Sequence, residues 1–565
     1  MADIIGKVTA TESKPTTCTT VRFWVDGNIF IRPFDIVRIQ HRSKQAGPSH
    51  SYAMVTDLSY ITDSAGHLAN FVSSDFGDVN ARPLNERLGT TLAEATILGN
   101  SEDIELPLRD GASVEWAEKE EIVRALGLEG LKRPIPAGYM RTSNDQTVCV
   151  SFDWQYLIGP ESAHFNISGI SGLAAKTSYT MFLLAAIQQV ARKGGDNVAL
   201  IVFNVKGADL LAIDETNPEL TEQDRQEWRE LGLAAELLAD VRFLYPYSAR
   251  TPTRTLSAVP SDVIERQLDQ NKAFRYYYDV HTFLGGESGD EEDTGSEKLS
   301  LLFSDVEDPS QTQQSIYQEV SRFGVKTWSD FYRRIEERTR KGTSEKGANI
   351  SVLSWRKFNR LIKTRVRNQD LFTEPSTMHD RQQVLLQDQL KQLRAGQVLV
   401  VDIARLDTYL QCLVVGDVTR TLLDAKQGFV EEISSEELGR VVVFVDELNK
   451  FAMKTQGGGG DGMLTRWLLD ITERGRSLGI VLFGAEQFRS GVHDRVLGNC
   501  ATGAHGRTNP VELHRAADYR HLLSDSQRAN LTRLRQGEML LQHPLFRTPM
   551  VKVQFPKPAY RQLKD

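Results

Sequence analysis

Residues 441 to 447 read Val-Val-Val-Phe-Val-Asp-Glu, so five apolar residues run directly into two adjacent carboxylates. A run of this kind predicts a strand that is buried on both faces, as in a parallel sheet. Asp446 and Glu447 would then lie at the carboxyl end of the strand, where open α/β sheets place their ligands. In a nucleotide hydrolase, the first acid would hold Mg²⁺ and the second would polarise the attacking water. A buried strand that ends in ordinary solvated acids is the alternative.

The composition is that of a large protein with buried cores. The chain has 565 residues, 40% of them hydrophobic and 25% charged, which is enough for two to four domains. No apolar run reaches the ~18 residues of a membrane span, and the N-terminus lacks the features of a secretory signal. The four cysteines form no C-x-x-C pair, so we expect no zinc site or disulfide framework and a reducing, cytoplasmic location. The net charge of −8 disfavours a surface that coats nucleic acid but is compatible with a locally basic pore.

Two patterns of hydrophobicity divide the chain. Up to about residue 75, short alternating segments separated by turn residues predict a small antiparallel barrel. From Phe165 onward, apolar strands alternate with helical segments, which predicts an α/β fold with a mainly parallel sheet and helices on both faces. The predicted domains are an N-terminal barrel and connector over 1–150, a core in two parts over 151–214 and 393–545, a helical insertion over 215–392, and a C-terminal segment over 546–565.

The insertion is rich in charged and helix-forming residues. Apolar residues recur there at helical spacing, which is typical of amphipathic helices that cover a core. The predicted helices span 227–241, 261–281, 311–322, 328–340 and 381–393.

A glycine-rich turn precedes the first long helix of the predicted α/β domain. From 167 to 178 the chain reads Ile-Ser-Gly-Ile-Ser-Gly-Leu-Ala-Ala-Lys-Thr-Ser. Glycines let the backbone wrap a phosphate, and the helix N-terminus adds a favourable field. Lys176 would neutralise phosphate charge, and Thr177 or Ser178 would hold Mg²⁺. The predicted nucleotide-binding residues are Gly169, Ser171, Gly172, Ala174, Ala175, Lys176, Thr177 and Ser178.

This turn departs from the usual phosphate loop. The common pattern places glycines six residues and one residue before the lysine, whereas here Gly169 lies seven residues before Lys176 and Ala175 directly precedes it. The extra methyl group would hinder phosphate contact unless the loop is reshaped. A glycine-rich turn without a ligand is the alternative. We favour nucleotide binding because the strand, the glycines, the Lys-Thr pair and the helix occur in the required order.

Two arginines and a glutamine follow the acidic strand. Arg474 and Arg476 lie between a predicted helix and the strand at 479–483, and Gln487 follows that strand. An arginine that reaches the γ-phosphate, from the same or a neighbouring subunit, offsets charge in the transition state, and a glutamine can sense that phosphate. Taken singly, these residues are better explained as a solvated helix end and a polar loop residue.

Taken together, the order of these motifs resembles the HerA family, ring-forming ATPases of the HerA and FtsK group. The resemblance continues in Val-Leu-Gly-Asn-Cys at 496–500 and in Arg-Thr-Asn-Pro at 507–510. Glu486 stands where the family pattern has threonine. The segment at 203–209 looks like the family's strand-end motif with Asn-Val in place of Asp-Pro, and the N-terminal barrel resembles the family's HAS-barrel.

The resemblance implies a RecA-like P-loop core with ATP and Mg²⁺ as cofactors, in a hexameric ring with double-stranded DNA in its central channel. It also implies an ATP-dependent DNA translocase or helicase that works with a partner nuclease or other effector docked on the barrel, in anti-phage defence by analogy. The C-terminal segment would brace the adjacent subunit. The implied catalytic residues are Lys176 for phosphate, Thr177 and Asp446 for Mg²⁺, Glu447 for water, Gln487 as a sensor, and Arg474, Arg476 and Arg507 as candidate trans arginines.

Two other functions remain open from the residues. The alanine before the lysine is compatible with a ring scaffold that binds nucleotide weakly and mainly assembles a partner enzyme. A conjugation-type DNA pump is a third hypothesis, because Lys206-Gly207 is also similar to coupling ATPases, but the lack of a transmembrane segment argues against it.

Overall fold

The computed structural model describes residues 4–563 apart from 44–46, 74, 79, 81–87, 162, 171–174, 285–291, 304–309, 342–349, 375–379, 431–434 and 455–460. The chain forms two compact units. The first comprises residues 1–152 and 517–554, and the second comprises residues 153–516 and 555–565.

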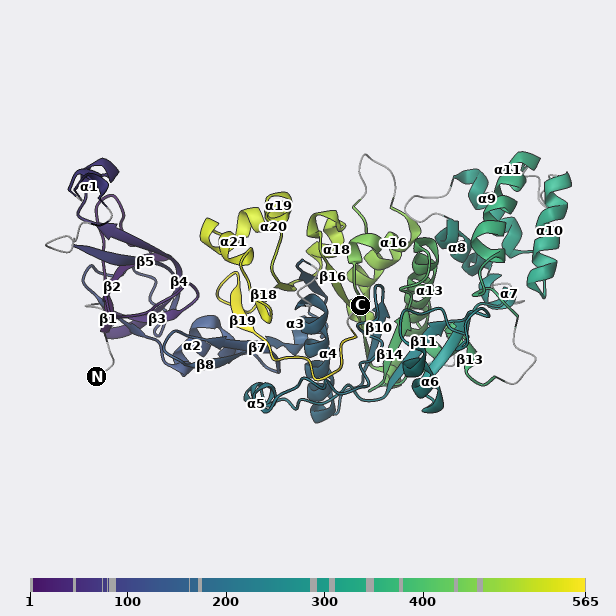
Figure 1. Cartoon of the computed structure of the whole chain (residues 1–565), viewed down its shortest axis with the longest axis horizontal. Coiled ribbons are helices and arrows are strands. Elements are labelled where there is room, and N and C mark those ends of the chain that lie inside the picture. The colour runs from purple at the N-terminus through teal and green to yellow at the C-terminus, as the bar shows by residue number, and fades with distance from the viewer. Residues whose placement is uncertain are drawn as a thin grey trace. The chain divides into compact units, whose positions relative to one another are not determined.

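The first unit contains a closed barrel in which each strand pairs antiparallel with its neighbours, in the order β1-β2-β5-β4-β3-β6 (Figure 1). Alternate residues point inward, so that Ile5, Phe23 and Val37 lie in the barrel core. The sequence prediction of an N-terminal antiparallel barrel is therefore confirmed. The barrel strands are β1 (Ile4–Val8), β2 (Thr20–Val25), β3 (Ile36–Ser43), β4 (Gly47–Thr62), β5 (Gly89–Asn100) and β6 (Ser113–Trp116).

In the rest of the first unit, strands from residues 517–554 join strands from the segment that follows the barrel. Strands from both regions follow one another in the order β18-β19-β7-β8. Helices α2, α20 and α21 belong to the same unit. The bounds are β7 (Pro134–Arg141), β8 (Thr147–Asp153), β18 (Glu538–Gln542), β19 (Val551–Gln554), α1 (His67–Ser73), α2 (Lys119–Leu126), α20 (Ala517–Leu522) and α21 (Asp525–Leu531).

The second unit is built on a parallel sheet with the strand order β13-β12-β11-β14-β10-β15-β16-β9-β17. Every residue of β10, β14 and β16 is buried, because helices cover both faces of a parallel sheet. The strands are β9 (Phe165–Ser168), β10 (Val198–Asn204), β11 (Val241–Pro246), β12 (Ala273–Tyr277), β13 (Gln383–Leu385), β14 (Val398–Asp402), β15 (Arg440–Val445), β16 (Ile480–Glu486) and β17 (Thr502–His505).

Two long helices pack on opposite faces of this sheet. Helix α13 (Thr408–Lys426) shares a hydrophobic cluster with Val441, Val443 and Val445 of β15. On the other face, Tyr179 of helix α4 (Ala175–Gly194) packs on Phe165 of β9, whose ring centroid is 5.0 Å from that of Phe483 in β16. The predicted α/β fold, a mainly parallel sheet with helices on both faces, is thus observed.

The predicted helical insertion contributes strands as well as helices. The predictions of helices over 227–241 and 261–281 were partly wrong: α5 spans Glu222–Glu230, α6 spans Ser261–Asp269, and β11 and β12 follow them. These strands are rich in β-branched and aromatic residues and lengthen the sheet beside β14, where tertiary pairing overrides the helical pattern. The helices predicted over 311–322 and 328–340 are confirmed as α9 (Gln311–Ser321) and α10 (Trp328–Lys341).

Helices α8 to α11 gather in one helical group in Figure 1.

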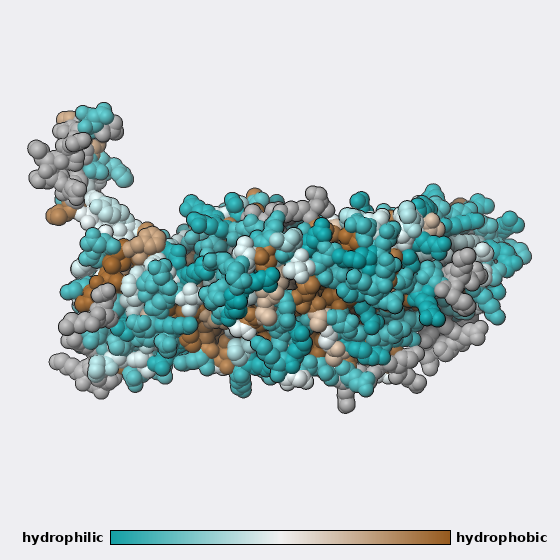
Figure 2. All heavy atoms as spheres, turned by 60° about the horizontal axis from the view of Figure 1, so that its bottom comes forward, coloured by the Kyte–Doolittle hydropathy of each residue, from teal (hydrophilic) through white to brown (hydrophobic). Residues whose placement is uncertain are grey.

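On the face shown in Figure 2, hydrophilic residues predominate, with apolar residues gathered in patches between them. Among the residues that the structure describes, no helix is both long enough and apolar enough to span a membrane. The other α-helices described in the second unit are α3 (Trp154–Leu157), α7 (Val280–Leu284), α8 (Glu292–Phe303), α11 (Val352–Ile362), α12 (Leu386–Lys391), α14 (Ser435–Leu438), α15 (Leu448–Phe451), α16 (Met463–Asp470), α17 (Arg476–Leu478), α18 (Asp494–Gly498) and α19 (Pro510–Arg515).

Candidate nucleotide-binding site

The strand order brings the two predicted halves of the site to one edge of the sheet. Strand β16 lies between β9, which precedes the glycine-rich turn, and β15, which precedes the acidic pair. All three strands run parallel, so their carboxyl ends share an edge. The described ends of the glycine-rich turn and the acidic pair therefore lie at the same edge as the end of β16, where α/β sheets place their ligands.

Lys176 and Asp446 meet at this edge. Lys176 Nζ lies 3.9 Å from Asp446 Oδ1, and the two side chains are 7% and 20% exposed. The lysine belongs to the first turn of α4 and the acid directly follows β15. At this separation the two side chains form an ion pair, which puts a cation suited to phosphate and a carboxylate suited to a metal ion side by side.

The local environment of Asp446 raises the pKa of its carboxyl group. Burial raises the pKa of Asp446, whereas the charge of Lys176 and a hydrogen bond from the Glu447 backbone N–H lower it, and the net direction is upward. A bound cation would remove this unfavourable balance, because positive charge stabilises a carboxylate that is short of solvent. The acid is therefore suited to a metal ion that arrives with the nucleotide.

Glu447 turns the chain away from the sheet. Its backbone is left-handed, with φ 53° and ψ 45°, and it is the residue that precedes α15. A left-handed conformation at a residue with a Cβ is unfavourable by roughly 1 kcal/mol or more, and such residues cluster at functional sites. The glutamate side chain is partly exposed.

The glycine-rich turn is described only at its two ends. Ser171, Gly172 and Ala174 lie outside the described residues, and only the backbone of Ala175 is described. At Gly169 a Cβ would come within 3.3 Å of Gly506 Cα, so glycine suits the close approach of the two chains there.

At the other end of the turn, Thr177 and Ser178 occupy the first turn of α4. Thr177 is half-buried, whereas Ser178 is buried and its Oγ accepts a hydrogen bond of 2.7 Å from Gln562 Nε2. The structure thus places Thr177 beside Lys176 but engages Ser178 with the C-terminal segment.

The other predicted site residues divide between the two edges of the sheet. Gln487 directly follows β16, and Arg507 follows β17, where its carbonyl oxygen accepts a 2.8 Å hydrogen bond from Ile170 N. Both therefore lie at the edge of Lys176. Arg474 and Arg476 are exposed and precede β16, at the opposite edge. From this position Arg474 and Arg476 do not reach the candidate site of their own chain. Arg507, in contrast, lies next to the glycine-rich turn of its own chain.

A buried polar cluster behind the acids was not assigned from the sequence. Glu486, the last residue of β16, is fully buried, and its Oε2 accepts a 2.9 Å hydrogen bond from Asn166 Nδ2. Arg489 donates to Asn166 Oδ1 and lies 4.0 Å from Glu486 Oε1. Burial raises the pKa of Glu486 to about 7, against the charges of Arg489 and Lys176. The signal in the sequence was a single glutamate at the end of an apolar strand.

Polar residues are also the last residues of two further pairs of strands at this edge. Ser168 Oγ of β9 lies 2.9 Å from Nδ1 of His505 in β17. On the other side, Asp402 of β14 accepts a 2.9 Å hydrogen bond from Asn204 Nδ2 of β10, and burial raises the pKa of Asp402 to about 6. Buried carboxyl, amide and imidazole groups thus line the carboxyl edge of the sheet, which is typical of a functional site rather than of a purely hydrophobic core.

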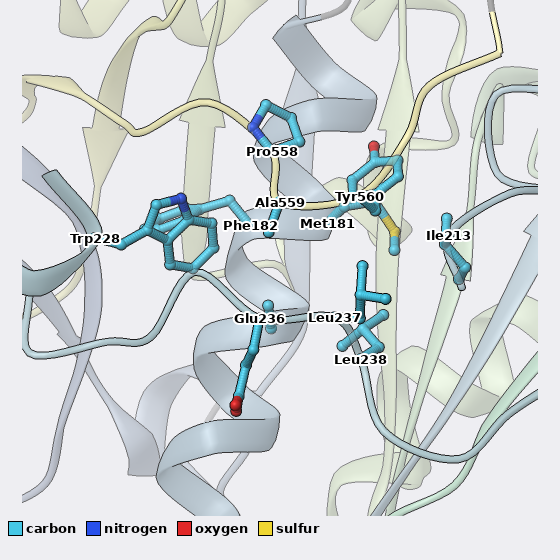
Figure 3. A pocket seen from close by; sticks show the side chains of 11 residues that line it. Met181, Phe182, Ile213, Trp228, Glu236, Leu237, Leu238, Pro558, Ala559 and Tyr560 are labelled. Carbon is cyan, nitrogen blue, oxygen red and sulfur yellow. The ribbon is translucent and has the colours of Figure 1, made fainter. Parts of the chain in front are cut away.

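The C-terminal segment packs on the helix that begins at the site. Trp228 Nε1 donates a 2.9 Å hydrogen bond to the Lys557 carbonyl oxygen, and Asn217 Nδ2 donates one of 2.9 Å to that of Pro558. Figure 3 shows Tyr560 beside Met181 of α4, and Pro558, Phe182 and Trp228 line the same pocket. In this chain the segment lies on its own second unit. A brace against a neighbouring subunit stays a prediction.

The oxygen donors at the edge fit Mg²⁺. This ion takes oxygen ligands, keeps several waters and is bound by one or two carboxylates together with the phosphates of its nucleotide. Asp446 supplies a carboxylate and Thr177 a hydroxyl at adjoining segments. Within the described part of the chain there is no group of three or more His, Cys, Asp or Glu residues that would form an all-protein metal cage.

No protein-family model and no curated protein matches this sequence. Among solved structures, the bacterial conjugative coupling protein TrwBdeltaN70 is 11% identical over 71% of this chain and 87% of its own, with a TM-score of 0.38. The genome packaging NTPase B204 from Sulfolobus turreted icosahedral virus 2 is 17% identical over 28% of this chain and 67% of its own, with a TM-score of 0.20. EssC (ATPases 2 and 3) from Geobacillus thermodenitrificans is 11% identical over 77% of this chain and 46% of its own, with a TM-score of 0.28. These scores carry no assignment of function, which has to come from the geometry of the site.

Proposed function

We propose that this protein is an ATPase that binds ATP and Mg²⁺ at the edge formed by β9, β16 and β15. The observation that carries the proposal is the approach of Lys176 Nζ to Asp446 Oδ1 within 3.9 Å. These residues come from two distant stretches of the sequence, each of which predicts half of a nucleotide site. A lysine for phosphate and an acid for the metal ion are the two groups that such a site requires.

Each residue has a separate part in the proposed reaction. Lys176 would neutralise the terminal phosphates, and Thr177 and Asp446 would hold the metal ion, which supplies charge neutralisation at the phosphates when bound. Glu447 would orient and deprotonate the attacking water from its partly exposed position after β15. Gln487, which follows the intervening strand, would contact the γ-phosphate.

The proposal extends to a motor that acts on DNA. Its support is the resemblance of the motif order to HerA-type ATPases, together with the placement of Arg474 and Arg476 at the edge opposite Lys176. Arginines on the far edge can serve the nucleotide of a second copy in a ring but not that of their own chain. A hexamer around double-stranded DNA, a partner nuclease or effector on the barrel, and a role in anti-phage defence belong to the same proposal.

A scaffold that binds nucleotide but turns it over weakly is the second candidate. The observation in its favour is Ala175, which stands where the usual phosphate loop has glycine directly before the lysine. In that case the ring would assemble a partner enzyme, and nucleotide would stabilise the assembly.

Steady-state ATP hydrolysis by the full chain and by Glu447→Gln tests the proposal. We expect the variant to retain ATP binding and to lose turnover by about a hundredfold or more, because it keeps the shape of the side chain but not the base. Exposed Glu222→Gln on α5 is the matched control and should keep full activity. Background turnover in both the wild type and Glu447→Gln, with ATP still bound, would favour the scaffold.

Mass measurement with and without a non-hydrolysable ATP analogue tests the ring. A stable monomer under every condition would contradict the motor, whereas a nucleotide-dependent closed oligomer would support it.

A further inference from the structure

A basic hollow lies at the amino edge of the sheet in the second unit. Strands β10, β15 and β16 begin there, and the hollow of about 380 Å³ is lined by the segments that lead into them. Its lining includes Asp196, Lys426, Arg440 and Arg476. The candidate nucleotide site occupies the opposite, carboxyl edge, so this is a second and separate place.

The charges that line the hollow do not balance. Among the described residues that line it, Lys426, Arg440 and Arg476 are basic and Asp196 is acidic. Both Lys426 and Arg440 line the hollow, and burial together with the charge of Arg440 lowers the pKa of Lys426 to about 8. Lys426 is buried and donates a hydrogen bond to the Gly439 carbonyl oxygen. Holding two like charges together in partly desolvated surroundings is unfavourable unless an anion joins them.

Arg440 has a donor that is ready for such an anion. Its Nη1 is buried and has no hydrogen-bond partner among the described residues. Burial lowers the pKa of Arg440, and Asp196 opposes that effect. An unused, buried guanidinium donor is energetically unfavourable, and oxygen atoms of an anion would satisfy it. The exposed Arg476 adds a second guanidinium at the rim of the same hollow.

We propose that this hollow binds a phosphate group through Arg440, Arg476 and Lys426. Guanidinium groups bind the paired oxygens of phosphate bidentately, and a buried ammonium adds a point charge. The volume is ample for one phosphate and for part of the molecule that carries it. The phosphate belongs either to a nucleotide or to the backbone of DNA, since both present the same oxygens.

Equilibrium dialysis of inorganic phosphate against the full chain tests this site. Lys176→Met serves as the background, so that the candidate nucleotide site does not contribute. We expect this variant to bind one phosphate per chain, and Arg440→Gln with Arg476→Gln to weaken that binding at least about tenfold. Arg476→Gln alone, at an exposed position, should weaken binding without any change in thermal unfolding.

Arg495→Gln is the matched control, because Arg495 is an exposed arginine of the same unit that pairs with Glu473. It should leave phosphate binding within twofold of the background value. Loss of all phosphate binding in Lys176→Met would overturn the proposal, and so would binding that is indifferent to Arg440 and Arg476. Neither result depends on ATP turnover, so failure here is distinct from failure of the proposed ATPase.

Competition identifies the source of the phosphate. In the same background, displacement of inorganic phosphate by ATP but not by a 20-base-pair duplex supports a nucleotide. Displacement by the duplex, with a salt dependence that becomes shallower by about one unit for each arginine removed, supports DNA. Displacement by neither overturns the proposal.

Discussion

Replacing Glu486 by glutamine tests whether the carboxyl edge of the sheet, where the candidate nucleotide site lies, contains a carboxylate whose ionisation destabilises the fold. Glu486 is fully buried at the end of β16, and burial raises its pKa from 4.5 to about 7. Glutamine keeps an oxygen that can accept the hydrogen bond from Asn166 Nδ2 but cannot ionise. The substitution therefore removes the titration while preserving the shape of the side chain.

The sign of the effect follows from the raised pKa. The folded chain holds the proton more tightly than the unfolded chain, so the stabilisation from protonation is fully present below pH 4.5 and is lost as the pH rises through about 7. The whole shift corresponds to about 3 kcal/mol at 1.36 kcal/mol per unit. Between pH 5.5 and pH 8 the wild type should lose about 2 kcal/mol of unfolding free energy from this group alone.

Urea denaturation followed by circular dichroism at these two pH values measures the difference. We expect the wild type to lose about 2 kcal/mol more than Glu486→Gln between pH 5.5 and pH 8. Arg489 is charged at both pH values. The loss of its partner Glu486 therefore changes the unfolding free energy of the variant by the same amount at both, and this change cancels when the pH dependence of the two proteins is compared. Exposed Glu222→Gln should behave as the wild type does. Equal pH dependence of the wild type and Glu486→Gln would refute the reasoning.

Three other substitutions probe the site, the core and the C-terminal segment. Lys176→Met should weaken binding of a fluorescent ATP analogue at least about tenfold, because phosphate loses a charged donor; unchanged affinity would exclude the proposed site. Lys298→Met leaves Asp417 buried without its 3.3 Å partner, which should lower the unfolding free energy in urea by about 3 to 5 kcal/mol. Adding Asp417→Leu should restore most of that loss, and a further decrease would speak against the ion pair. Trp228→Phe removes one hydrogen bond to the Lys557 carbonyl oxygen and should destabilise the docked segment by about 1 kcal/mol, seen as faster hydrogen exchange of its amides; unaltered exchange would be the contrary result.

The elements that the sequence predicted well are those whose pattern has one physical explanation. Five apolar residues before Asp446 can be buried on both faces only in a covered sheet, and the alternation in 20–25 suits only a strand with one inner face. By contrast, 241–246 and 273–277 lie among charged helical segments, and helix and strand patterns overlap in short apolar runs. Parallel pairing beside β14 decided between them.

The features of the candidate site also fall into those that the sequence predicted and those that only the fold decided. A lysine after a glycine-rich turn and two acids after a buried strand are local features, and their chemistry can be read from the residue types and spacing. Their approach to 3.9 Å, the insertion of β16 between their strands, and the burial of Glu486 and Arg489 beside Asn166 all depend on contacts between distant parts of the chain. Sequence patterns determined which groups are present because side-chain chemistry and local periodicity are properties of neighbouring residues. The tertiary structure decided which groups share an edge, and which are shielded from water, because strand order and burial arise only when the whole sheet assembles.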